Sequence, residues 1–173
     1  MRTKRLSAFL MTVVLVLSMG LSGCKSNKSK NFKAISQEEL TKALESRGFV
    51  VYEHEDARAK FNLFADYSDI GVSVMFNYYL LDSEKASDEM FEDFYKMTKA
   101  LSEEQGLTGD IEKTDRYIYA KYEVSGTREG DGKPDILVIK AENTLLLCYT
   151  NMAEEAYAIR KEVLTELGIK IEL

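Results

Sequence analysis

The sequence predicts one α+β domain: a mostly antiparallel sheet of about four or five strands with three helices packed chiefly on one face. Three segments repeat apolar residues at helical spacing, and five others alternate apolar and polar residues or run continuously apolar, as strands do. Residues 34–173 contain one proline, Pro134, and no linker-like stretch that would divide them. An antiparallel sheet backed by helices is the simplest way to cover these apolar stripes.

The three helices have recognisable ends. The first is expected to begin at Ser36, which forms a capping box with Glu39, and to end at Gly48. The second is expected over about 83–105 and the third over about 152–167. Their predicted buried stripes are Leu40, Ala43 and Leu44 in the first, Ala86, Met90, Phe94, Met97 and Leu101 in the second, and Ile159, Val163, Leu164 and Leu167 in the third.

The predicted strands follow the apolar patterns between these helices. They cover residues 49–54, 71–81, 116–124, 135–140 and 144–150. The last two are joined by the short segment 141–143, which suits a hairpin. Residues 57–69 show no clear period, and a short helix is one interpretation of them.

The N-terminus has the pattern of a secretory signal. Three basic residues, Arg2, Lys4 and Arg5, precede an apolar run over about 8–19 that is too short to span a bilayer. The run ends in Leu-Ser-Gly-Cys at 21–24, which resembles the lipobox of bacterial lipoprotein precursors. The resemblance implies a signal peptide over 1–23 and a lipidated Cys24 as the first mature residue. The alternative is an ordinary signal or short anchor with an incidental cysteine.

A polar segment separates Cys24 from the predicted domain. Residues 24–33 carry four lysines and almost no apolar side chain, so we expect a flexible tether between the lipid and a domain over 34–173. The lysines either lie against anionic headgroups or keep a solvated spacer soluble. The expected location is the extracytoplasmic face of the cell membrane, with the N-terminal lipid as the membrane contact.

The charge of the chain is divided unevenly. It has 23 basic and 29 acidic residues, and seven basic residues but no acidic ones lie at or before Lys33. The predicted domain therefore carries 16 basic and 29 acidic residues, a formal charge of −13. Such a balance argues against a nucleic-acid partner, which requires a basic surface.

A second resemblance covers residues 83–168. The segments SEKASDEMFEDF, VIKAENTLLLCYT and VLTELGI follow a pattern of acidic amphipathic helix, strand pair with an Asn-Thr hairpin, and closing helix ending in Leu-Gly. In this respect the chain resembles small uncharacterised bacterial surface lipoproteins, although its GTREGDGKPD loop is longer. The resemblance implies fold and surface location only.

The sequence contains no catalytic motif that we recognise, and we expect no enzyme activity, metal or cofactor. The single histidine, His54, lies beside Glu53 and Glu55 but lacks the further ligands that zinc catalysis requires. The glycine-rich 126–135 loop lacks the spacing of an EF-hand. Cys148 sits in an apolar run and is expected to be an inert core residue. The enzymatic alternative is a carboxylate-dependent envelope hydrolase, because acids are the one abundant catalytic residue type.

Two tyrosines are the candidate binding residues. Tyr117 and Tyr119 alternate with Ile118 and Ala120 in a predicted strand, so they share a side that also carries Lys121. Exposed tyrosines suit contacts to an envelope protein, peptide or glycan. The alternatives are that they cover the outer surface of the sheet or lie under residues 57–69. The sequence therefore predicts a non-catalytic binding or accessory module.

Overall fold

The computed structural model describes residues 32–104, 109–122, 135–151 and 153–171, all within one compact unit, Asn31–Leu173. The predicted signal peptide, Cys24, most of the tether and residues 126–134 of the glycine-rich loop lie outside the described residues. The described elements, in chain order, are α2 (Gln37–Glu45), β1 (Val50–His54), β2 (Phe61–Asp69), β3 (Val72–Leu80), α3 (Glu84–Glu104), β4 (Ile111–Lys113), β5 (Tyr117–Lys121), β6 (Asp135–Ala141), β7 (Thr144–Thr150) and α4 (Glu154–Glu166). None of these helices is long and apolar enough to cross a membrane.

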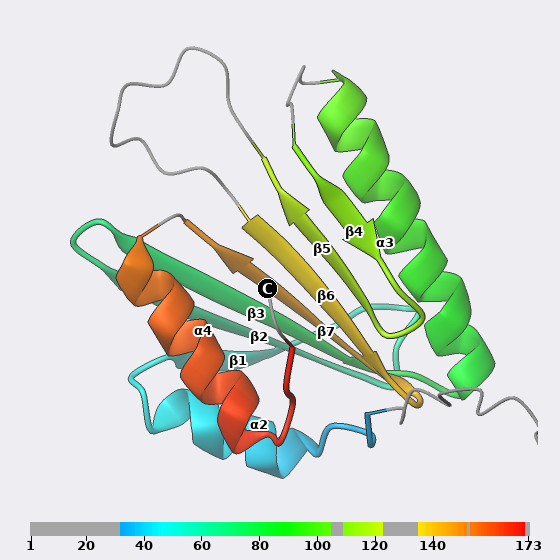
Figure 1. The fold of residues 1–173 in the computed structure, drawn as a ribbon. Helices are drawn as coiled ribbons and strands as arrows, with labels where there is room; N and C mark the ends of the chain where they lie inside the picture. Colours follow the sequence, from blue (N-terminus) through cyan, green and yellow to red (C-terminus); the bar gives the residue numbers. More distant parts are fainter. Residues whose placement is uncertain (1–31, 105–108, 123–134, 152, 172–173) are drawn as a thin grey trace, which may run out of the picture. The chain divides into compact units, whose positions relative to one another are not determined.

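The strands form one antiparallel sheet in the order β1-β2-β3-β7-β6-β5-β4 (Figure 1). The predicted count of four or five strands is wrong, because the described sheet has seven. The sequence pattern missed β2 because Asn62, Asp66 and Ser68 are residue types with low strand propensity. It missed β4 because three residues are too few to show an alternation.

The helices pack on both faces of the sheet, so the prediction that they lie chiefly on one face is also wrong. α2 and α4 contact each other and cover one face; their side chains Leu44 and Val163 share a core cluster with Leu146 of β7. α3 belongs to a second cluster, in which Phe91 packs with Leu145 of β7. Because successive strand residues point to opposite faces, Leu145 and Leu146 place α3 opposite the other two helices. Figure 1 shows α2 and α4 together, with α3 apart from them.

The first helix follows its predicted signals closely. The Ser36 side chain caps α2 by accepting a hydrogen bond from the Glu39 amide at 3.4 Å, and Gly48 follows the helix with a φ of +80°. Ile35 is held from both sides, since its amide donates to Thr144 Oγ1 at 3.1 Å and its carbonyl accepts from the Tyr78 hydroxyl at 2.8 Å. These two hydrogen bonds attach Ile35, which precedes α2, to strands β3 and β7.

The buried stripe of α3 differs from the predicted one by part of a turn. Met90 and Phe94 are buried as expected, but Met97 is 46% exposed and Thr98 is buried instead. The Thr98 hydroxyl donates to the Phe94 carbonyl at 2.8 Å, which satisfies it inside the helix. The hydrophobic pattern predicted Met97 as the buried residue in place of Thr98, because hydrophobicity takes no account of this local hydrogen bond.

Candidate functional site

The side of β1 that points toward the α3 face is largely open. Of the described residues, four large hydrophobic side chains are strongly exposed, and two of them, Val50 (64%) and Tyr52 (47%), lie on β1. They share one side because they are two residues apart in a strand. Tyr52 stacks on Phe64 of β2, its partner in the register, with ring centroids 5.2 Å apart. The contact orders the exposed ring without burying it.

The neighbouring strands extend this surface. Asp66 of β2 lies opposite Val50, and Met75 of β3 lies opposite Asp66, so both point to the same side; both are half-buried. We call the surface formed by Val50, Tyr52, Phe64, Asp66 and Met75 the open face. Its contiguous apolar and aromatic side chains distinguish it from singly scattered surface hydrophobics.

The exposed surface around β1 is acidic. Glu53 and Glu55 are exposed, and neither forms an ion pair within the described part of the chain; the same holds for Asp66. Lys60, the nearest lysine along the chain, pairs with Asp82 at 3.2 Å. The carboxylates around β1 are therefore available to a basic partner.

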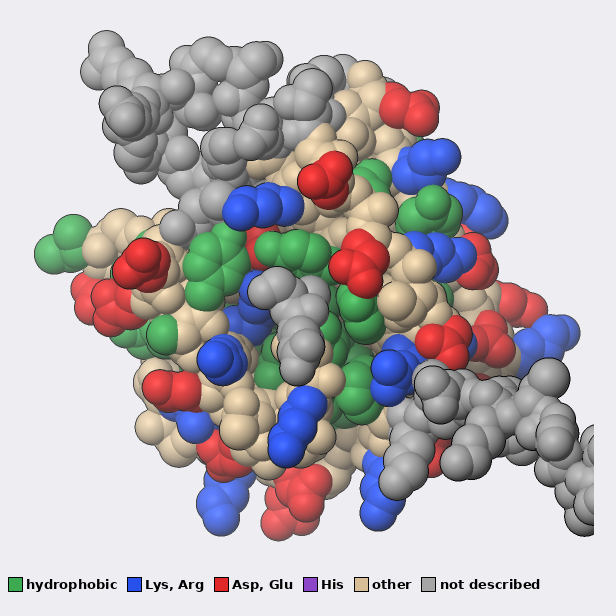
Figure 2. Space-filling view, in the orientation of Figure 1, with side chains coloured by type: hydrophobic (Ala, Val, Ile, Leu, Met, Phe, Trp, Pro, Cys, Tyr) green, Lys and Arg blue, Asp and Glu red, His purple; other side chains and the backbone are tan. Residues whose placement is uncertain are grey.

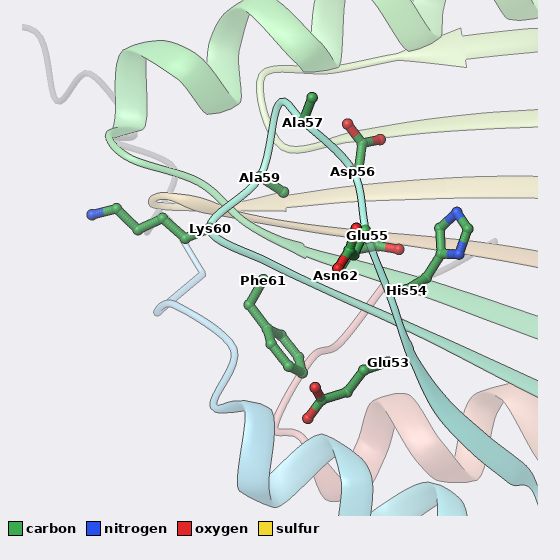
Figure 3. Close-up of a pocket in the computed structure, with 9 residues that line it drawn as sticks. All are labelled: Glu53, His54, Glu55, Asp56, Ala57, Ala59, Lys60, Phe61 and Asn62. Atoms are coloured by element: carbon green, nitrogen blue, oxygen red, sulfur yellow. The ribbon is translucent and has the colours of Figure 1, made fainter.

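A hollow of about 730 Å³ lies beside the loop that connects β1 to β2 (Figure 3). Its lining residues are Glu53, His54, Glu55, Asp56, Ala57, Ala59, Lys60, Phe61 and Asn62. The Glu53 and Phe61 side chains lie on one side of the strands, and His54 points the other way. This geometry separates His54 from Glu53, as the alternation of a strand end predicts. Among the described residues, no three His, Cys, Asp or Glu side chains are grouped to hold a metal ion.

Two polar side chains of this hollow, Asp56 and Asn62, are held by local hydrogen bonds. Hydrogen bonds from the Arg58 side chain and amide lower the pKa of Asp56 to about 2. The amide group of Asn62 donates to Asn77 Oδ1 at 2.7 Å and to the Tyr78 carbonyl at 2.9 Å. These contacts stabilise the loop between β1 and β2. They do not form an acid–base pair.

Tyr117 and Tyr119, the tyrosines predicted from the sequence, lie on the α4 side of the sheet and are half-buried against its core cluster. Ile118 and Ala120 between and after them are fully buried on the other side, as the alternation predicts. The Tyr117 hydroxyl donates to Glu112 of β4. In Figure 2 hydrophobic side chains gather near the middle of the view, with acidic and basic side chains around them.

A buried ion pair lies beneath Tyr119, and no pattern in the sequence predicts it. Arg160 of α4 donates to the carboxylate of Asp135, and their side chains are 6% and 0% exposed. The guanidinium lies 5.9 Å from the Tyr119 ring centroid and 5.1 Å from that of Tyr157. Burial and then the Asp135 carboxylate raise the pKa of Tyr119. The Asp135–Arg160 pair therefore holds α4 against β6.

Cys148 belongs to the same part of the core. It is fully buried, and burial raises the pKa of its thiol well above the ordinary value. A protonated, inaccessible thiol is neither a nucleophile nor a metal ligand. Asp135 is the one acidic side chain that is buried within the described ranges, and it is held by Arg160.

Comparisons with known proteins add no family to this geometry. No protein-family model matches the chain, and no curated protein resembles it closely enough to count as a relative. The site must therefore be interpreted from its own residues.

Proposed function

We propose that the chain is a membrane-anchored extracytoplasmic lipoprotein that acts as a non-catalytic binding or accessory module through the open face. The lipobox-like 21–24 segment supports the anchor. The observation that carries the binding role is the exposure of Val50 and Tyr52 beside the stacked Phe64. An aromatic side chain gives a partner a large contact area at a small cost in conformational entropy.

The open face takes precedence over Tyr117 and Tyr119 as the proposed contact surface. Tyr119 is engaged with the buried Arg160, and the Tyr117 hydroxyl is engaged with Glu112. The Tyr52 side chain is about half exposed, and its ring contact within the described residues is the stack on Phe64. The Tyr117–Tyr119 surface stays a prediction, and the hydrolase alternative has no such observation behind it.

The anchor is tested by Cys24→Ser, because serine lacks the thiol that accepts the lipid. We expect loss of labelled palmitate from the protein and its release from the membrane fraction, or accumulation of the precursor. Equal labelling and equal membrane retention in the variant would contradict the anchor.

The binding face is tested by a photocrosslinking amino acid placed at Tyr52 in intact cells, with Met97 of α3 as the matched control position. The two side chains are almost equally exposed, at 47% and 46%, so a difference in yield cannot come from exposure alone. We expect a discrete crosslinked product from position 52 that position 97 does not give. Equal products from both positions, or none from position 52, would contradict the role of the open face.

A further inference from the structure

The outer edge of β1 presents unpaired backbone groups. β1 is the terminal strand of the described sheet, so its backbone is paired only with β2. Hydrogen bonds from Leu81 N to Asn143 O at 2.9 Å and from Asn151 N to Ser73 O at 3.0 Å show that odd-numbered residues of β3 bond to β7. Even-numbered residues of β3 therefore bond to β2, because residues of an antiparallel strand alternate between their neighbours.

The register of β3 with β2 and that of β2 with β1 extend the same alternation to the edge strand β1. It leaves even-numbered residues of β2 bonded to β1, so Val50, Tyr52 and His54 bond inward. Val51 and Glu53 then direct their N–H and C=O groups outward. Phe49 fits the same alternation, since its amide donates to Leu44 O, away from β2. No described residue bonds to the outward groups of Val51 and Glu53.

On this basis we propose that the edge of β1 binds an extended peptide segment of a partner protein by strand addition, and that this segment alternates apolar residues with lysine or arginine. The inference rests on the proposed binding function and names the class of partner. Strand addition supplies affinity through the backbone and specificity through alternate side chains.

The side chains of β1 define the alternation. An added strand would place alternate residues beside Val50 and Tyr52, where apolar groups extend the open face. Its other residues would lie beside Val51 and Glu53, on the α2 side. Glu53 and Glu55 are exposed acids without ion pairs in the described ranges, so basic residues complement them.

Charge also favours this occupant over a second copy of the chain. The domain after Lys33 carries a formal charge of −13, which attracts a basic segment and repels an identical domain. Antiparallel pairing of two β1 strands would in addition bring their Glu53 side chains near each other. A second copy is thus an outcome to be tested, and it is not the proposed occupant.

The test measures amide hydrogen exchange at Val51 and Glu53 in the purified full-length chain. The probe is the acetylated, amidated peptide Lys-Val-Lys-Phe-Lys-Val-Lys, and its control has glutamate in place of every lysine. We expect fast exchange at both amides in the free chain and protection with the lysine peptide only. Binding without protection would overturn strand addition while leaving the binding function of the open face intact.

Two variants at one position separate the backbone from the charge. Glu53→Pro removes both the carboxylate and the outward N–H, and proline is tolerated on a strand edge. Glu53→Ala also removes the carboxylate but keeps the N–H, so the two variants differ in the backbone donor. Because one backbone hydrogen bond is lost, we expect Glu53→Pro to bind the lysine peptide about 2- to 10-fold more weakly than Glu53→Ala. Circular dichroism confirms that both are folded, and equal affinities would overturn the proposal.

A charge reversal tests the basic character of the partner. Glu53→Lys combined with Glu55→Lys should weaken binding of the lysine peptide and strengthen binding of the glutamate peptide, relative to the natural chain. An unchanged preference would overturn the assignment of a basic segment. Slow exchange at the Val51 and Glu53 amides in the free chain would also overturn the proposal. If that protection increased with protein concentration, the edge would be paired with a second copy of the chain. If it did not, the edge would be covered by residues of the same chain.

Discussion

Tyr52 of β1 and Ile118 of β5 lie in the same row across the sheet and point to the same side, yet one is 47% exposed and the other is fully buried. The difference follows from α3, which packs on β6 and β7 and shares a core cluster with Ile118. Among the described elements, only α2 and α4 cover the sheet at the β1 end, and they lie on its other face. Where helices cover both faces of the sheet, which we call the doubly covered part, the side chains are buried and stabilise the fold. The side chains of the open face have no helix over them and are accessible to a partner.

The largest expected effect lies in the doubly covered part, at the Asp135–Arg160 pair. Arg160→Met leaves the fully buried Asp135 carboxylate without its cation, so we expect a loss of about 3–5 kcal/mol in the free energy of unfolding. Urea unfolding followed by circular dichroism measures it. Adding Asp135→Asn in the same chain should restore part of the loss, because the uncompensated charge is gone. A loss below about 1 kcal/mol would show that the pair does not pin α4 to β6.

The second prediction compares a core residue with an open-face residue directly. Leu146→Ala creates a cavity where the side chain is fully buried between β7 and the helices α2 and α4, and should cost about 2–5 kcal/mol. Val50→Ala, at a side chain 64% exposed, should change the free energy of unfolding by about 0.5 kcal/mol or less. The same denaturation measurement covers both, and similar losses would remove the distinction between the two regions.

The third prediction concerns the Tyr78 hydroxyl in the core. Burial raises the pKa of Tyr78 to about 12, above its ordinary value of 10.0. Between these values the unfolded chain loses the proton and the folded chain keeps it, so the contribution is fully present below pH 10 and is lost as pH rises toward 12. Tyr78→Phe removes the bond to the Ile35 carbonyl, which should cost about 1 kcal/mol at pH 7. It should also make the loss of stability above pH 10 less steep in unfolding curves; an unchanged slope would contradict the assignment.

Much of the fold could be predicted because its signals are local. Ser36, Glu39 and Gly48 mark the ends of α2 through bonds and dihedral angles within a few residues. The alternation of Ile118 with Tyr119 places the two on opposite sides of β5, whatever lies around the strand. The α+β class and the antiparallel sheet follow from such patterns.

The rest depends on contacts between distant residues. Periodicity shows which stripe of α3 is apolar, but it does not show which face of the sheet that helix covers. Arg160 lies 25 residues from Asp135, and a basic residue in a helix is ordinarily solvated, so the ion pair had no sequence signal. Val50 and Tyr52 alternate like side chains of any strand, and only the position of β1 at the sheet edge reveals them as exposed.

The role proposed for the open face is binding, with little contribution to the free energy of unfolding. Its most direct test is the yield of the partner captured by crosslinking on intact cells from a Tyr52→Ser chain, with Met97→Ser as the control. We expect the yield to fall by about 10-fold or more for Tyr52→Ser, because aromatic anchors dominate interfaces, while Met97→Ser stays within about 2-fold of the natural chain. Loss of the stack on Phe64 should cost Tyr52→Ser only about 0.5–1.5 kcal/mol of folding stability. An unchanged yield, or the same fall in both variants, would show that the open face is not the binding surface.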